Sequence, residues 1–163
     1  MAAHTKILGI DPGFGRLGYS VISREGNNYI VECLGCLETY NNTAYEKRLL
    51  AIGSGIKKII REQNPDAIAL EKIYFTKNQK TAFKVAEARG ILIYLAAQNK
   101  IPLMEFAPLE VKTAICGYGK ADKKQVQAMV KMLLKLETIP KYDDTTDALA
   151  ITLTAFAYHK IGL

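Results

Sequence analysis

The sequence has little of what stabilises secreted proteins or anchors membrane proteins. Its 163 residues include three cysteines, two histidines and no tryptophan. The odd number of cysteines, and the lack of a signal-peptide pattern after Met1, favour a reducing compartment, so we expect a cytoplasmic protein without a disulfide framework. The longest apolar run, residues 91–97, is far shorter than the roughly 20 residues that cross a bilayer. We therefore expect neither secretion nor membrane insertion.

What the sequence has instead is the composition of one globular domain with a basic segment. Hydrophobic residues make up 49% and charged residues 23% of the chain, without linker-like or repetitive tracts, so we expect a single domain over residues 1–163. The net charge is +6, and residues 72–135 carry twelve Lys/Arg against four Asp/Glu. A polyanionic partner would explain this bias, and so would an ordinary solvated surface.

Hydrophobic periodicity and turn residues predict an α/β fold. The predicted strands cover residues 6–11, 17–24, 29–39, 66–70 and 102–106, and the predicted helices cover 44–63, 80–98, 109–116, 122–136 and 144–158. This order is typical of a five-stranded mixed sheet flanked by helices, and it resembles the ribonuclease H-like fold. The helix over 80–98 is apolar on nearly all sides after Gly90, so we expect it to be buried or to form an interface.

Four acidic residues stand where a sheet of this kind usually holds a ligand. Asp11 ends a buried strand directly before a Pro-Gly turn, and Glu71 follows the strand over 66–70 in the same way. Asp144 and Asp147 are three residues apart at a predicted helix start, so both carboxylates project from one face. Carboxylates beside buried strands cost free energy unless they are paired or hold a cation, and carboxylates without Cys or His partners suit Mg²⁺ or Mn²⁺. The pattern predicts a divalent-metal site.

Each of these signals also has a structural explanation. Asp11 and Glu71 could mark strands that leave the core, and an Asp before a helix is most often an N-cap, which is the role we predict for Asp143. Cys33 and Cys36 have metal-ligand or redox spacing, but without a second pair we interpret them as structural thiols. Only the joint occurrence of the four acids in this fold order favours the metal site.

A series of short motifs runs in order along most of the chain. It opens with Ile-Leu-Gly-Ile-Asp-Pro-Gly at residues 7–13 and Gly18-Tyr19. The motifs that follow are Ala69-Leu70-Glu71-Lys72, Thr76-Lys77-Asn78, Ala88-Arg89-Gly90, Val111-Lys112, Gln125-Val126-Gln127 and Asp147-Ala148-Leu149-Ala150-Ile151. This series resembles the RuvC family of bacterial Holliday junction resolvases from residue 7 to about residue 155.

The resemblance implies a homodimeric, Mg²⁺-dependent endonuclease that binds four-way DNA junctions. Such enzymes nick two strands of like polarity symmetrically, leave 5′-phosphate and 3′-hydroxyl ends, and work beside a branch-migration motor of the RuvA–RuvB type. The catalytic and metal-binding acids of the family fall on Asp11, Glu71, Asp144 and Asp147. Two ions roughly 3.5–4 Å apart would act there, with Mn²⁺ as a substitute for Mg²⁺ and Asp11 as the shared ligand.

The resemblance also implies DNA contacts in and near the basic segment. Lys112 and Lys123 match lysines implicated in DNA binding, and Tyr74 matches an aromatic residue that stacks at the junction centre. Tyr74 and its neighbour Phe75 could instead anchor a small core. Charge alone adds five further candidates for DNA contact: Lys77, Lys80, Lys84, Lys120 and Lys124.

Three other functions remain open from the residues alone. Residues 11–15 resemble the first phosphate loop of the actin and heat-shock-protein-70 ATPases, although the second lobe and second loop of those enzymes are missing. A non-catalytic junction-binding module would not need all four acids. A ribonuclease H that cuts RNA–DNA hybrids would share the fold, but the motifs at 69–90 and 111–127 favour the resolvase.

Overall fold

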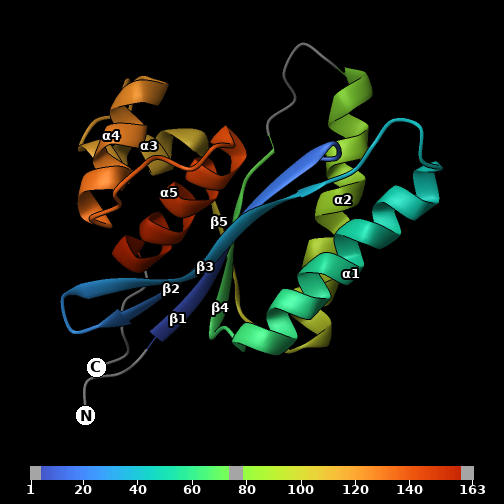
Figure 1. The fold of residues 1–163 in the computed structure, drawn as a ribbon, viewed down its shortest axis with the longest axis horizontal. Coiled ribbons are helices and arrows are strands. Elements are labelled where there is room, and N and C mark those ends of the chain that lie inside the picture. The colour runs from blue at the N-terminus through green and yellow to red at the C-terminus, as the bar shows by residue number, and fades with distance from the viewer. Residues whose placement is uncertain (1–4, 74–78, 159–163) are drawn as a thin grey trace.

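The computed structural model describes residues 5–73 and 79–158, which form a mixed sheet with helices on both faces (Figure 1). The strands are β1 (Thr5–Asp11), β2 (Arg16–Glu25), β3 (Asn28–Glu38), β4 (Ala67–Glu71) and β5 (Leu103–Phe106). They lie in the order β3-β2-β1-β4-β5. The pairs β1–β2 and β2–β3 are antiparallel, whereas β1–β4 and β4–β5 are parallel. The predicted five-stranded mixed sheet is confirmed.

Two groups of helices cover the two faces of the sheet. α1 (Tyr45–Gln63) and α2 (Gln79–Gln98) lie on one face, and α3 (Pro108–Cys116), α4 (Lys123–Leu133) and α5 (Asp143–Tyr158) lie on the other (Figure 1). Each group encloses its own cluster of buried hydrophobic side chains. None of the helices within residues 5–73 and 79–158 has the length and apolarity that crossing a membrane requires.

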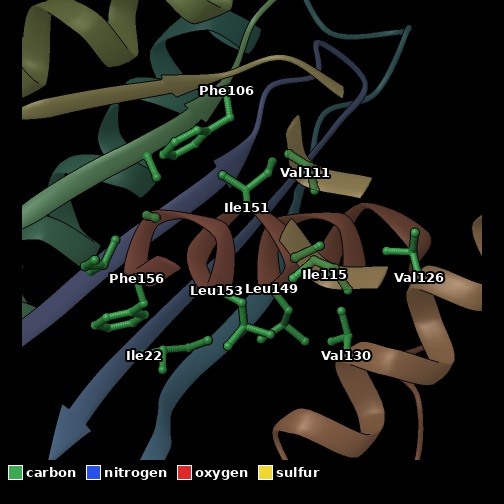
Figure 2. Close-up of a cluster of buried hydrophobic side chains, with 14 of the residues drawn as sticks. Ile22, Phe106, Val111, Ile115, Val126, Val130, Leu149, Ile151, Leu153 and Phe156 are labelled. Carbon is green, nitrogen blue, oxygen red and sulfur yellow. The ribbon is translucent and has the colours of Figure 1, made fainter. Parts of the chain in front are cut away.

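The alternation of side chains along the strands builds both cores at once. In β1, Ile7 belongs to the core on the α5 side and the next residue, Leu8, belongs to the core on the α1–α2 side. On the α5 side, Ile22 of β2 lies near Leu153 and Phe156 of α5 (Figure 2). The middle residues of β1 and of β4 are buried on both faces of the sheet, so the polar side chains of these two strands lie at the strand ends.

Helix α5 lies closer to the sheet than ordinary side chains would allow. A β-carbon at Gly9 of β1 would collide with Thr152, and one at Gly18 of β2 would collide with the backbone of Asp144. Beside these contacts, the hydroxyl oxygens of Ser20 and Thr152 share a buried hydrogen bond of 2.5 Å. The two glycines therefore determine how near the first half of α5 comes to β1 and β2.

All ten predicted elements are present, and their ends differ from the predictions by a few residues. The helix predicted over 122–136 is the largest difference, because α4 ends at Leu133. The expectation for α2 holds on one side only: Leu92 is buried against α1 and the sheet, whereas Phe83 and Tyr94 are 67% and 61% exposed. Helix α2 thus carries an uncovered apolar side.

Candidate active site

Asp11 and Glu71 are neighbours because β1 and β4 are adjacent and parallel. The register pairs Ile10 with Leu70, so the following residue of each strand, Asp11 or Glu71, leaves the sheet at the same edge. Both residues are half-buried there. The structure brings these two acids together at the carboxyl ends of the strands, where open α/β sheets usually bind ligands.

The first turn of α5 brings the other two acids to the same edge. Gly18 pairs with Asp11 across the β1–β2 ladder, and the backbone of Asp144 lies directly against Gly18. Asp147, one helical turn later, lines a pocket together with Glu71. All four predicted acids therefore gather at one edge of the sheet, from β1, β4 and α5.

Burial and mutual repulsion disfavour ionisation of these acids. The pKa of Asp11 is raised from 3.8 to about 8, mainly by burial and further by the negative charges of Asp147, Glu71 and Asp144. Burial is also the main reason why the pKa values of Glu71 and Asp147 are raised. A positive charge placed among these carboxyl groups would be stabilised, because it would restore their ionised forms.

Lys123 of α4 supplies one such positive charge. Its Nζ lies 2.9 Å from Oδ2 of Asp143 and 3.7 Å from Oδ2 of Asp147. The hydrogen bond to Lys123 lowers the pKa of Asp143, which also accepts a hydrogen bond from Nε2 of Gln127 at 3.1 Å. The N-cap role predicted for Asp143 is wrong: α5 begins at Asp143 itself, and the carboxylate pairs with α4 instead.

Arg16 is a basic residue of the site that the sequence analysis missed. Its Nε lies 3.3 Å from Oδ2 of Asp144, and its guanidinium carbon lies 5.6 Å from the centre of the Tyr142 ring. Arg16 begins β2 directly after the turn that follows Asp11. That closeness in sequence to a candidate acid was the available signal.

The turn after Asp11 is held in place by Arg48 of α1, which was also missed. The Arg48 side chain is buried and donates hydrogen bonds from Nε to Oγ1 of Thr39 (3.0 Å) and from Nη1 to Oδ1 of Asn41 (3.1 Å). Its guanidinium carbon lies 3.8 Å from the centre of the Phe14 ring, and Thr39 Oγ1 donates to the Phe14 carbonyl at 2.5 Å. These contacts tie the turn to the segment that follows β3.

The donor set at this edge fits a hard divalent cation by its chemistry. The four side chains offer carboxylate oxygens, which are the ligands that Mg²⁺ and Mn²⁺ prefer. Within the described ranges, no three acidic, histidine or cysteine side chains form a ready chelate, so the acids share a patch rather than a single point. Burial and the neighbouring acids raise the pKa of Asp11, and a bound divalent cation would stabilise its ionised form.

The lysines predicted to contact DNA are distributed unequally around this patch. Lys112 of α3 and Lys123 of α4 line the same pocket as Glu71 and Asp147. The charge of Lys112 lowers the pKa of Glu71, against the larger effect of burial. Both predicted lysines are therefore beside the acids.

The remaining candidates either do not line this pocket or fall outside the described residues. Lys84 of α2 has its ammonium group 5.5 Å from the centre of the Phe14 ring, on the turn after β1. Lys120 and Lys124 are exposed near the start of α4. Three candidates and one further side chain fall outside the described residues: Tyr74, Phe75, Lys77 and the side chain of Lys80.

A mixed sheet in this order, with acids at the ends of two adjacent parallel strands and at the start of a helix packed across them, is the arrangement of the ribonuclease H-like class of proteins. The family described as crossover junction endodeoxyribonuclease RuvC matches residues 7–155. The protein of that name from Natranaerobius thermophilus is 46% identical over 149 residues, which cover 90% of this chain and 91% of the relative. The one from Thermosipho melanesiensis is 48% identical over 146 residues, with 90% and 93% covered.

Solved structures agree with the sequence comparison. Thermus thermophilus RuvC superposes with a TM-score of 0.88 at 30% identity, covering 94% of this chain and 95% of that chain. The same protein in complex with Holliday junction substrate gives a TM-score of 0.90 at 29% identity, with 95% and 94% covered. The chain belongs to the RuvC family. This membership agrees with the motifs at 69–90 and 111–127 and gives no support to the ATPase alternative.

Proposed function

We propose that this protein is an endonuclease that resolves four-way (Holliday) DNA junctions during homologous recombination and DNA repair. Its relatives are described as crossover junction endodeoxyribonucleases, and one structural match is a complex with Holliday junction substrate. The observation that carries the proposal is the gathering of Asp11, Glu71, Asp144 and Asp147 at one sheet edge, beside two lysines. Paired symmetric nicks would leave 5′-phosphate and 3′-hydroxyl ends.

The four acids are the proposed catalytic and metal-binding residues. Two Mg²⁺ ions, or Mn²⁺ in their place, would when bound lower the pKa of the attacking water and stabilise the leaving oxygen. Asp11 is the proposed shared ligand, since it leaves the sheet beside Glu71 and pairs with Gly18, against which the backbone of Asp144 packs. Being partly buried, the carboxyl groups are shielded from bulk water, which strengthens their interaction with any cation.

Lys112 and Lys123 are the proposed contacts to DNA phosphates, together with Tyr74 as the stacking ring. Both lysines line the pocket beside Glu71 and Asp147, so a phosphodiester bound at these two acids would lie near both ammonium groups. Their attraction offsets the repulsion between the phosphate and the carboxylates. Such contacts give affinity that depends on salt and little on sequence.

A homodimer is the proposed assembly, because symmetric nicking needs two active sites related by a two-fold axis. Helices α1 and α2 together form a surface groove lined by Leu50 and Tyr94, among others. These two residues are 69% and 61% exposed. Large apolar side chains grouped on a surface favour a covered interface, and we place the dimer contact here. A branch-migration motor of the RuvA–RuvB type is the proposed partner, and the cytoplasm is the proposed location.

A synthetic mobile four-way junction, labelled on each strand, tests the proposal. With Mg²⁺ we expect paired nicks from the wild type, and junction binding without nicking from Asp11→Asn and Glu71→Gln. Glu62→Gln is the matched control, since it removes an acid from an exposed pair with Lys58 and should leave nicking unchanged. Near-normal nicking by either active-site variant would refute the acid cluster. Faster cutting of duplex DNA or of an RNA–DNA hybrid than of the junction would refute the substrate.

A further inference from the structure

A pocket of about 200 Å³ beside the acids has an apolar floor that the proposed reaction does not use. Three helices supply this floor: Pro108 and Val111 from α3, Val126 from α4, and Ala150 and Ile151 from α5. In Figure 2, Val111, Val126 and Ile151 project from these helices within the core on the α5 side. The pocket therefore joins the hydrophobic core to the active-site edge.

Charged side chains line the same pocket on its active-site side. Glu71 and Asp147 belong to the acid patch, and Lys112 and Lys123 are the proposed phosphate contacts. A phosphodiester held by the lysines would place its attached sugar and base within reach of the floor. The lysines of the pocket thus suit the phosphate of a nucleotide. The apolar residues suit an uncharged part of the same nucleotide.

The floor is preformed rather than adaptable. Val111, Val126 and Ile151 are at most 8% exposed and belong to the packed core on the α5 side. The start of α4, which carries Val126, is fixed by a capping box in which Asp122 and Gln125 exchange hydrogen bonds of 2.8 and 2.9 Å. A rigid apolar surface offers nothing to an ion or a phosphate, but it packs well against the face of a base.

We propose that this pocket receives the base of a nucleotide adjoining the cut phosphodiester, as a base-binding subsite next to the catalytic acids. The inference rests on the proposed function. The volume of the pocket, about 200 Å³, is below the roughly 300–1,000 Å³ of sites for drug-sized ligands. A pocket of this size suits one ring system rather than two stacked bases. Nicking should then depend on the presence and size of that base, so the floor residues contribute to sequence preference.

Junctions with single abasic sites test this subsite, because an abasic nucleotide keeps its sugar and phosphate and loses only the base. The cut is first mapped on the intact junction, and each nucleotide next to it is then replaced in turn. Val126→Met fills the pocket and Val126→Ala enlarges it. Val130→Ala is the control, since Val130 is buried on the same helix but does not line the pocket. Single-turnover nicking rates and junction affinities are measured for every pair.

We expect base removal at one position to slow wild-type nicking about tenfold, because the transition state would lose the apolar contacts between the base and the floor. The Val130→Ala variant should keep this sensitivity to base removal. Val126→Met should nick the intact junction slowly, and removal of the base should reduce its nicking rate only a little further. If Val126→Met does not fold, a reduced sensitivity in Val126→Ala gives the same support. Equal sensitivity in wild type and both Val126 variants, or none in a wild type that nicks normally, would overturn the subsite alone. A wild type that nicks no junction would overturn the proposed function with it.

Discussion

Replacing Asp11 with asparagine should stabilise the metal-free protein, by an amount that grows with pH. The folded protein holds the Asp11 proton up to a pKa of about 8, whereas an unfolded chain releases it near 3.8. Below pH 3.8 both states are protonated and the group has no effect. As pH rises toward 8 only the folded state binds the proton, so the free energy of unfolding falls. Asparagine removes this dependence, because it does not titrate.

The magnitude follows from the same two pKa values. Between pH 3.8 and pH 7 the folded state keeps a proton that the unfolded chain has lost. Each pH unit of this interval lowers the free energy of unfolding by about 1.36 kcal/mol, which gives a total of roughly 4 kcal/mol at pH 7. Partial exposure of Asp11 and local rearrangement reduce this upper value. A net gain of about 1 kcal/mol would raise the Tm of a domain of this size by roughly 2–4 °C.

The assay is a series of thermal melts of wild type and Asp11→Asn from pH 5 to pH 8, with EDTA or with excess Mg²⁺. The difference in Tm should widen with pH in EDTA, and Mg²⁺ should raise the Tm of the wild type more than that of the variant. Asp143→Asn is the control of opposite sign: Lys123 lowers the pKa of Asp143, so this exposed carboxylate stays ionised from pH 5 to pH 8 and its replacement should lower the Tm slightly and by the same amount across that range. A variant Asp11→Asn that melts below the wild type at pH 8 in EDTA would refute the reasoning.

Three further predictions test other parts of the structure. Lys123→Ala should weaken junction binding and reduce the slope of log affinity against log salt by about one phosphate, measured by fluorescence anisotropy; an unchanged slope would place Lys123 away from DNA. Tyr94→Glu should turn a dimer into a monomer in sedimentation experiments, and a wild type that is already monomeric on a junction would contradict the interface. Gly18→Ala should destabilise the fold by about 1–3 kcal/mol in urea and slow nicking, since the added carbon pushes Asp144 outward; normal stability would show that α5 shifts freely.

Much of the site could be predicted because it depends on where strands end. Asp11 and Glu71 each follow an apolar strand, and parallel neighbouring strands must deliver such residues to the same edge. Asp144 and Asp147 lie at a helix start that turn residues and periodicity mark in the sequence. The element order then determines which edge the helix reaches, so local patterns were sufficient.

The contacts that were missed join side chains from elements distant in the chain. Asp143 was assigned as an N-cap because capping is a local rule, and no local rule reports that Lys123, twenty residues earlier, lies beside it. Arg48 reaches back to Phe14, and its helical position predicts burial or exposure but not its partner. The apolar pocket needs three helices at once, which periodicity within a single helix does not describe.

The contact between α5 and the sheet through Gly9 and Gly18 has a consequence for how this protein can change in evolution. Because atoms of the backbone set the separation there, the volumes of neighbouring core side chains do not determine where Asp144 stands relative to Asp11. We therefore expect exchanges of core residues to disturb the distance between Asp144 and Asp11 less than a substitution at Gly18 would. The same contact leaves the two glycines themselves almost no freedom to vary.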